Sequence, residues 1–438
     1  MSPFVVKAIQ LLMSLSILII LHELGHFIPA RIFKTRVEKF FLFFDVKFSL
    51  IKKKIGQTTY GIGWLPLGGY VKISGMIDES MDKEQMLQSP KPWEFRSKPA
   101  WQRLIIMLGG VTVNLILGFL IYMMILFVWG KYTLSSDDLP LGLNPSPVVA
   151  ELGFQLGDQI LNVNGKPLEN VLEINKYFLL REVNEVSVKR KTGEITTISI
   201  PKNIGNRMFE SGEMFPFSPV FPAILDSIVP GSPAGLNGLK SGDKILYIND
   251  TPITNWDDFK ENMSEESKKI NLVLDRNNKP LNFEITTSEN GTLGVYPKAD
   301  FINFKLETLN FGESIVEGFD YGYWTLRDYI AQFKYIFTTK GASQLGGFGA
   351  IGNMFPGQWN WKGFWSSTAL ISIILAFMNV LPIPALDGGH VMFLCYEIIT
   401  GRKPNDKFLE YAQIFGFFLL LTLVLYANGN DIYRAIFN

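Results

Sequence analysis

The segment His22-Glu23-Leu24-Gly25-His26 contains the residues best suited to chemistry. On a helix, residues four apart lie on one face, so His22 and His26 can both turn an imidazole towards one metal ion. Glu23 can then reach a water molecule bound to that metal and accept its proton. The pattern therefore predicts a metal-dependent hydrolytic site. The alternative is that the segment merely holds polar residues near a helix end.

An apolar run leads directly into this segment. Only 14 residues separate Lys7 from His22, which is the length of a signal-peptide core or a buried soluble helix. No small-x-small cleavage site follows, so we reject the signal peptide. If the helix continues to about Pro29, it is long enough to span a bilayer and carries Glu23 and His26 to membrane depth. Ionisable groups at that depth indicate a functional site, because a bound metal would offset their desolvation.

Three further apolar runs complete a set of four membrane spans. No Asp, Glu, Lys or Arg occurs in residues 104–130, 364–386 or 411–430, and each run has the ~20 residues that a bilayer requires. Hydrophobic residues make up 47% of the 438-residue chain, and phenylalanine alone numbers 35. We therefore predict a polytopic α-helical membrane protein whose first span covers about residues 5–29.

Charge balance and cysteine content exclude several classes of protein. The chain carries 41 basic and 41 acidic residues, so no global basic field favours nucleic-acid binding. Its single cysteine, Cys395, allows neither an intramolecular disulfide nor a cysteine-based zinc site. We therefore expect no nucleic-acid partner and no disulfide framework.

The loops between the spans predict the orientation of the chain. Residues 31–103 carry 14 Lys and Arg, and the short loop 399–408 adds three more. Four spans put these two loops on one side, which the positive-inside rule assigns to the cytoplasm. Residues 131–362 and both termini then face outward.

Residues 40–72 read as short strands and turns, because aromatic and β-branched residues alternate with Gly and Pro. Backbone of this kind enters a membrane only where protein covers it or where it lines a cavity. An edge strand beside the metal would offer an unfolded substrate something to pair with. An ordinary cytoplasmic hairpin fits the same pattern equally well.

The outward segment contains an internal repeat. The twelve residues that begin at Gly157 align with the twelve that begin at Gly242, with an offset of 85 and six identities. A repeat of two with this length predicts tandem globular domains, at residues 131–215 and 216–300. Gly-Asp followed by Ile-Leu-x-(Val/Ile)-Asn and a Pro-marked turn resembles the PDZ domain in its circularly permuted bacterial form. Such domains bind an extended peptide along a sheet edge, and packing as a plug above the membrane part is an equal alternative.

Residues 301–362 connect this repeat to the third span. They contain an aromatic, amphipathic stretch that suits a helix lying in the membrane interface, followed by a glycine-rich loop. Residues 363–438 then form the second membrane half, with spans at about 364–386 and 411–430.

A second group of candidate site residues lies at the end of the third span. Asp387 is the first carboxylate after the apolar run, and it follows two prolines and precedes Gly-Gly, a pattern that breaks a helix where freed backbone lines a site. A catalytic zinc takes three protein ligands and keeps one open position, so Asp387 would complete the set begun by His22 and His26. A helix cap is the alternative role for Asp387, and His390 is the rival ligand.

These features together resemble the site-2 protease family, and within it the bacterial branch that regulates sigma-E. The resemblance rests on the His22 motif in the first span, Asn379-x-x-Pro382-x-x-x-Leu-Asp387-Gly in the third, and the paired PDZ-like repeats between spans two and three. Residues 66–72, Pro-Leu-Gly-Gly-Tyr-Val-Lys, match the same branch. Two departures are Phe43-Phe-Asp-Val, where the family often has Gly-Phe-Gly-Pro, and Leu108-Gly-Gly, where it commonly has Ala-Gly-Pro.

The resemblance implies one zinc ion per chain, held by His22, His26 and Asp387, with Glu23 as the general base. The first membrane half, residues 1–130, and the second half, residues 363–438, would together form the protease core.

The resemblance also implies how a substrate is held and where the protein works. Asn379, Gly68 and Gly69 would contact the substrate, and residues 40–72 would form a membrane-associated β-loop. Expected substrates are single-pass membrane proteins already trimmed by another protease, such as anti-sigma factors, and signal-peptide remnants. The expected location is the bacterial inner membrane, with the lipid bilayer as a further partner and the PDZ-like domains on the periplasmic side.

Two rival functions belong to other classes. A membrane-anchored PDZ scaffold with an inactive metal site would be expected to have lost one of the ligands or Glu23, and all are present. A metal transporter would need a polar path across the membrane, yet the span at 411–430 carries no charge. The sequence therefore favours the protease.

Overall fold

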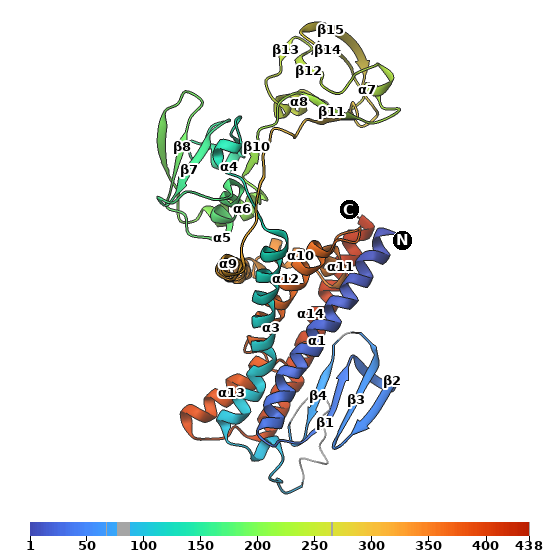
Figure 1. The fold of residues 1–438 in the computed structure, drawn as a ribbon, viewed down its shortest axis with the longest axis vertical. Coiled ribbons are helices and arrows are strands. Elements are labelled where there is room, and N and C mark those ends of the chain that lie inside the picture. The colour runs from blue at the N-terminus through green and yellow to red at the C-terminus, as the bar shows by residue number, and fades with distance from the viewer. Residues whose placement is uncertain (67, 77–87, 264–265, 438) are drawn as a thin grey trace. The chain divides into compact units, whose positions relative to one another are not determined.

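A computed structural model describes residues 1–66, 68–76, 88–263 and 266–437. The chain divides into two compact units, and Figure 1 shows the ribbon of the whole chain, coloured from the N- to the C-terminus. Unit 1 comprises Met1–Gly130 and Thr308–Asn438, and unit 2 comprises Lys131–Glu307. Leu67, within the motif at residues 66–72, lies outside the described residues.

Four helices among the described residues are long and apolar enough to cross a membrane, which confirms the prediction of a four-span protein. The helices are α1 (Pro3–Ile32), α3 (Ala100–Trp129), α12 (Trp361–Val380) and α14 (Asp406–Phe437). In α1, Ser2 caps the first turn by accepting a hydrogen bond from the Val5 amide, and the helix continues unbroken through the His22 motif. Both termini lie at the same end of unit 1 (Figure 1).

The third span is shorter than its apolar run predicts. Helix α12 ends at Val380, whereas the uncharged run continues to residue 386. Two prolines follow, and proline disfavours helical backbone in the residue before it. Ala385 then takes a left-handed conformation with φ 77°, and a new helix, α13 (Asp387–Thr400), begins at the predicted ligand. The helix break therefore places Asp387 in the first turn of α13.

Residues 37–73 form a four-stranded sheet beside α1 (Figure 1). The strands are β1 (Val37–Leu42), β2 (Phe44–Ile55), β3 (Thr58–Leu65) and β4 (Tyr70–Ile73), in the order β2-β3-β1-β4. Strand β1 pairs parallel with β3 and antiparallel with β4. The predicted strands are present, and β4 forms one edge of the sheet. A short 3-10 helix, η1 (Phe95–Ser97), precedes α3.

Helix α9 (Phe311–Ile336) packs across α3 through small residues. Ser314, Gly318 and Gly322 are its buried positions along that face, and Gly318 lies against Met123. Figure 1 shows α9 nearly end-on while α3 runs lengthwise. Large aromatic side chains cover much of the exposed surface of α9, among them Phe311 and Phe319.

Two short helices occupy the segment that the sequence suggests is a glycine-rich loop. They are α10 (Thr339–Gln344) and α11 (Phe348–Asn353). The Asp431 carboxylate of α14 accepts hydrogen bonds from the Gly347 and Ala350 amides at 2.9 and 3.1 Å. This distant side chain satisfies amides at the start of α11, which local sequence does not reveal.

Unit 2 contains two hydrophobic cores, one formed within residues 134–217 and the other within residues 223–293. The first is built from β6 (Leu143–Pro145), α4 (Pro147–Ala150), β7 (Gln159–Val163), η3 (Val171–Glu173), α5 (Ile174–Leu180), β8 (Glu185–Lys189), β9 (Ile195–Ser199), α6 (Ile204–Ser211) and β10 (Phe217–Pro219). The second is built from β11 (Leu225–Ile228), α7 (Pro233–Leu236), β12 (Lys244–Ile248), β13 (Thr251–Pro252), α8 (Trp256–Glu261), β14 (Lys269–Arg276), β15 (Lys279–Thr286) and β16 (Val295–Pro297). Strands β5 (Lys131–Thr133) and β17 (Lys305–Glu307) pair where the chain enters and leaves the unit, and η2 (Ser136–Asp138) follows β5.

The two halves of unit 2 repeat one another in detail. Asp158 pairs with Arg190 in the first half, and Asp243 pairs with Arg276 in the second. Each arginine also donates to a backbone carbonyl, at Gly153 and Gly238 respectively, which are again 85 residues apart. Because β10 pairs with β6, the first half extends to Pro219, slightly beyond the predicted division at residue 215.

Candidate active site

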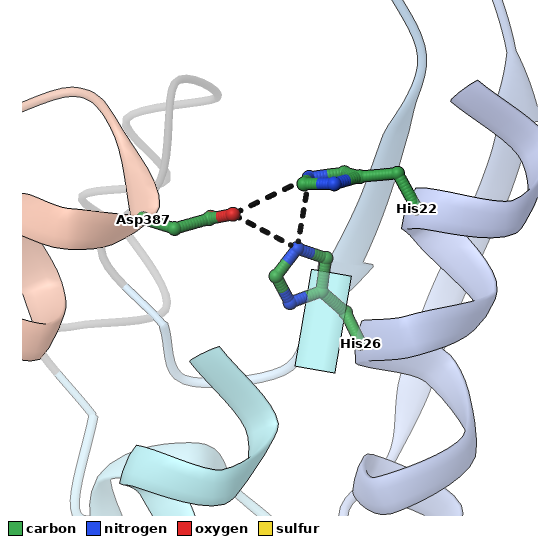
Figure 2. Close-up of side chains that lie close together, drawn as sticks. All are labelled: His22, His26 and Asp387. Carbon is green, nitrogen blue, oxygen red and sulfur yellow. Dashed lines mark hydrogen bonds and ion pairs between the residues drawn. The ribbon is translucent and has the colours of Figure 1, made fainter. Parts of the chain in front are cut away.

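Three side chains from two distant parts of unit 1 converge on one point (Figure 2). His22 and His26 extend from α1, and Asp387 extends from the first turn of α13. The Nε2 atoms of the two histidines each lie 3.3 Å from Asp387 Oδ2 and 3.2 Å from one another. The structure therefore brings together the three residues predicted as ligands, across 361 residues of sequence.

The spacing of these three atoms fits a tetrahedral zinc site. Nitrogen and oxygen ligands at tetrahedral zinc bond lengths lie about 3.3–3.5 Å from each other. Asp387 Oδ2 is buried and accepts no hydrogen bond from the described residues. A cluster of lone pairs facing one another is unfavourable unless a cation lies between them. The donor set thus matches the zinc ion that the sequence predicts.

His26 is held in the orientation that metal binding requires. Its Nδ1 lies 2.8 Å from the carbonyl oxygen of Ile106 on α3. A carbonyl only accepts hydrogen bonds, so Nδ1 carries the ring proton and Nε2 keeps a lone pair directed at the centre. Gly110, one turn further along α3, makes room for both rings, since a Cβ there would lie 2.6 Å from His22 Cε1.

The glycines after Asp387 allow α13 to start where it does. A Cβ on Gly389 would lie 2.7 Å from the Ile383 carbonyl, and a Cβ on Gly388 would clash with the Leu381 carbonyl. The chain folds tightly back on itself between α12 and α13, and this turn presents the Asp387 carboxylate to the histidines.

Glu23 lies beside the triad and against the sheet. It is 9% exposed, and its Cγ would lie 3.6 Å from a Cβ built on Gly69, the residue before β4. Gly69 permits this approach, because a Cβ there would meet Ile19 Cγ2 at 2.5 Å and the Phe41 carbonyl at 2.7 Å. An ionisable side chain next to three candidate ligands is well placed for proton transfer.

The three candidate ligands and Glu23 line one cavity of about 890 Å³. The other predicted site residues also line it: Asn379, Gly68, Gly69 and the rival ligand His390. The cavity is open to the outside of the unit and borders β4 along that strand's whole length, so an extended chain can enter beside the candidate metal site.

The free edge of β4 faces this cavity. The Ser74 amide donates to the Arg36 carbonyl, on the side of β1. Backbone groups alternate between the two sides of a strand, so Val71, three residues earlier, directs its amide the other way, away from β1. No described strand pairs with this side of β4. An added strand would find unpaired backbone groups here.

Sequence reasoning missed a polar cluster on the wall of the cavity. The Tyr70 hydroxyl donates to Asp45 Oδ1 at 2.7 Å, and Lys39 Nζ donates to the Tyr70 oxygen at 3.1 Å. Burial opposes ionisation of Asp45, but the Tyr70 hydroxyl and the Lys39 ammonium outweigh it and lower the pKa of the carboxyl. These residues lie on three different strands, and their spacing in sequence gives no sign that they meet.

The second missed residue is Asn114 on α3. The sequence marks it as a polar group within a span, whereas the structure places its side-chain nitrogen 3.2 Å from His22 Nδ1. An amide inside an otherwise apolar helix was the available signal.

Comparison with known proteins agrees with this geometry. The model of peptidase family M50 matches residues 10–423. The regulator of sigma E protease of Haemophilus influenzae is 28% identical over 451 residues, covering 97% of this chain and 98% of the relative. RseP of Escherichia coli, a regulator of sigma-E protease, is 24% identical over 469 residues, covering 99% and 100%. A relative from Campylobacter jejuni, provisionally named a zinc metalloprotease, is 29% identical over 431 residues, covering 96% and 92%.

Proposed function

The chain belongs to peptidase family M50, and from that premise we propose that it performs regulated intramembrane proteolysis with one zinc ion per chain. It hydrolyses a peptide bond in or near the membrane-spanning segment of single-pass proteins. The observation that carries the proposal is the convergence of His22, His26 and Asp387 on one point, with Glu23 beside them, within a bundle of membrane-crossing helices.

The chemistry divides among four side chains. His22, His26 and Asp387 hold the metal, and zinc bound there supplies an electrophile that polarises the scissile carbonyl and acidifies water. Glu23 accepts the proton of the attacking water at its carboxylate and later donates it to the leaving amine.

The free edge of β4 supports a mode of substrate binding. A membrane-spanning helix hides its carbonyls in hydrogen bonds, so the substrate must unwind before cleavage. Pairing with the Val71 edge stabilises the unwound chain as an added strand. Gly68, Gly69 and Asn379 line the same cavity, and in this mode they contact the substrate backbone.

The names of the relatives support a class of substrate. Proteins from Haemophilus influenzae and Escherichia coli are named regulators of sigma-E protease. We assign to this chain single-pass substrates of the anti-sigma-factor kind, which another protease has already trimmed, and remnants of signal peptides. The repeated halves of unit 2 act as PDZ-like domains that bind the exposed end of a trimmed substrate or exclude untrimmed ones.

The chain resides in the inner membrane of a bacterium, as the positive charge of residues 31–103 and 399–408 supports. These loops face the cytoplasm, and unit 2 faces the periplasm. The exposed aromatic residues of α9 suit a helix that lies in the membrane interface.

Metal content and cleavage, measured together, test the proposal. The full chain and its Glu23→Gln variant are purified in detergent, assayed for bound metal and incubated with a single-span substrate. We expect one zinc per chain in both proteins, with cleavage reduced about 10²- to 10⁴-fold in the variant, the usual contribution of a general base. Glu289→Gln, an exposed change in unit 2, serves as the matched control.

Two outcomes would contradict the proposal. Cleavage by Glu23→Gln at the rate of the unchanged chain would remove Glu23 from the mechanism. A metal-free, inactive chain that binds peptides through unit 2 would instead indicate a membrane-anchored scaffold.

A further inference from the structure

The two histidines of the triad differ in what holds them. His26 donates from Nδ1 to a backbone carbonyl, which leaves Nε2 free to bind metal. His22 presents Nε2 to the same centre, and its Nδ1 faces the side-chain amide of Asn114 at 3.2 Å. For both rings to bind one metal through Nε2, His22 must also carry its proton on Nδ1. An acceptor is therefore required where Asn114 lies.

The amide of Asn114 has its nitrogen facing His22 and its oxygen facing away. That oxygen is buried, and no donor within the described part of the chain reaches it. An NH₂ group only donates, so in this orientation the neutral His22 ring would hold its proton on Nε2. The proton would then occupy the point where the metal binds, between His22 Nε2 and Asp387 Oδ2.

The oxygen and nitrogen of an asparagine amide have nearly the same shape, and the hydrogen-bond network decides which is which. Turning the amide of Asn114 by half a rotation puts its oxygen at the 3.2 Å position beside His22 Nδ1. The NH₂ group then takes the buried place of the oxygen. The flipped amide therefore makes no more hydrogen bonds than before. It differs in that it accepts a hydrogen bond from His22 Nδ1 instead of donating one.

We propose that the Asn114 side-chain oxygen accepts a hydrogen bond from His22 Nδ1 and so holds His22 in the tautomer that binds metal through Nε2. Asn114 is a positioning residue, since it acts on the metal only through His22. Helix α3 then supports both histidines without providing a ligand, through Asn114 for His22 and through the Ile106 carbonyl for His26.

The surroundings of Asn114 suit this role. The residue is 1% exposed, and its backbone carbonyl accepts a hydrogen bond of 2.7 Å from the Ser372 hydroxyl of α12. Ser372 is itself fully buried. Three helices, α1, α3 and α12, therefore meet at this point, and the backbone of Asn114 is held where its side chain can reach His22.

The inference rests on the proposed zinc site, and a pair of shape-matched variants tests it separately. Asn114→Leu has a side chain of similar size with no acceptor, and Asn114→Asp has oxygens that only accept. Zinc affinity is measured on the full chain in detergent, by competition with a chelator after removal and reloading of the metal. We expect Asn114→Leu to bind zinc about 10- to 100-fold more weakly, as for other groups that orient a metal-binding histidine. Asn114→Asp should stay within roughly threefold of the unchanged chain, because a carboxylate is an equally suitable acceptor.

A second measurement reads the tautomer of His22 directly. The chain has three histidines, so ¹⁵N-histidine labelling gives few ring signals, and His390→Gln removes one of them. In the zinc-free chain we expect the His22 proton on Nδ1, and in Asn114→Leu we expect it to move to Nε2.

Three results would overturn the role of Asn114: equal zinc affinity in Asn114→Leu and the unchanged chain, equally weak binding in Asn114→Asp and Asn114→Leu, or a proton on His22 Nε2 in the zinc-free chain. Failure of the unchanged chain to bind zinc at all would count against the proposed function instead.

Discussion

Gly25 of α1 and Gly109 of α3 face each other with no space for a side chain on either. A Cβ on Gly25 would lie 2.6 Å from the carbonyl carbon of Gly109, and a Cβ on Gly109 would clash with the carbonyl oxygen of Gly25. Gly25 lies inside the His22 motif, so this tight contact between the two helices lies at the candidate metal site. Small residues permit this kind of contact between membrane helices.

Gly109→Ala should therefore separate α1 from α3. The added methyl group meets backbone, which cannot rotate away, so we expect a loss of about 1–3 kcal/mol in stability together with weaker zinc binding. Thermal unfolding and metal content in detergent measure both effects. Gly429→Ala on α14, where a Cβ meets nothing within 4 Å, is the control. Equal behaviour of the two variants would show that the helices do not depend on this contact.

Gly110→Ala should affect the metal more than the fold. Its Cβ would contact the rings of His22 and His26, at 2.8 Å from His22 Nδ1. Side chains can turn aside where backbone cannot, so we expect a small change in the unfolding temperature but zinc affinity at least about tenfold weaker. Chelator competition measures the affinity. A chain that unfolds early yet binds zinc normally when folded would contradict this expectation.

The two repeated ion pairs of unit 2 should respond oppositely to pH. Burial raises the pKa of Asp158 and outweighs the Gln155 amide and Arg190. Burial also acts on Asp243, but the two hydrogen bonds from Arg276 outweigh it, and the pKa is lowered. The ordinary value for both is 3.8. The stability that Asp243 contributes is therefore present above pH 3.8 and is lost as the pH falls through the lowered pKa of Asp243. The stability that Asp158 contributes is present below pH 3.8 and is lost as the pH rises through the raised pKa of Asp158.

Hydrogen exchange on the full chain between about pH 6 and 3, corrected for intrinsic exchange rates, separates the two halves. We expect acid to weaken protection in β12 and β14 and not in β7 and β8. Asp243→Asn should remove the acid response of the second half and leave the first half unchanged. The same response to acid in both halves would contradict the opposite pKa shifts of Asp158 and Asp243.

Asp431→Ala should release the segment that α14 holds. The carboxylate accepts from the Gly347 and Ala350 amides and pairs with Arg434, so its loss leaves two amides without their partner. We expect a local destabilisation of about 1–3 kcal/mol, seen as faster hydrogen exchange in residues 347–353. Thr422→Ala, on an exposed face of α14, is the matched control. Unchanged hydrogen exchange in Asp431→Ala would show that α11 is stable without the Asp431 carboxylate.

Patterns within short stretches of sequence predicted much of this molecule. The absence of charge over about twenty residues was enough for three of the four membrane helices, since hydrocarbon excludes ionised groups whatever the tertiary structure. The first helix was predicted only on the expectation that it continues through the His22 motif. The motif at His22 and the Asp387 segment were enough for the family, which the match over residues 10–423 confirms. The roles of the site residues, the PDZ-like nature of the two repeated halves and the predicted domain boundaries stay predictions.

What the sequence did not reveal depends on contacts between distant segments. Asn114 meets His22 across 92 residues, and Asp431 reaches Gly347 across 84. Neither contact leaves a periodic signal, because each involves a single side chain. The early end of α12 is different, since its cause is local: the prolines were visible, but the uncharged run suggested a longer helix.

The division of unit 1 between the two ends of the chain affects how the protein is made. His22 and His26 leave the ribosome early, whereas Asp387 follows only after all of unit 2 and α12 have been synthesised. At typical translation rates of about 5–20 residues per second, that gap lasts roughly 20–70 s. During this time a nascent chain carries two of its three candidate ligands and no complete candidate site. The order of synthesis thus completes the candidate site only after the inserted unit is finished.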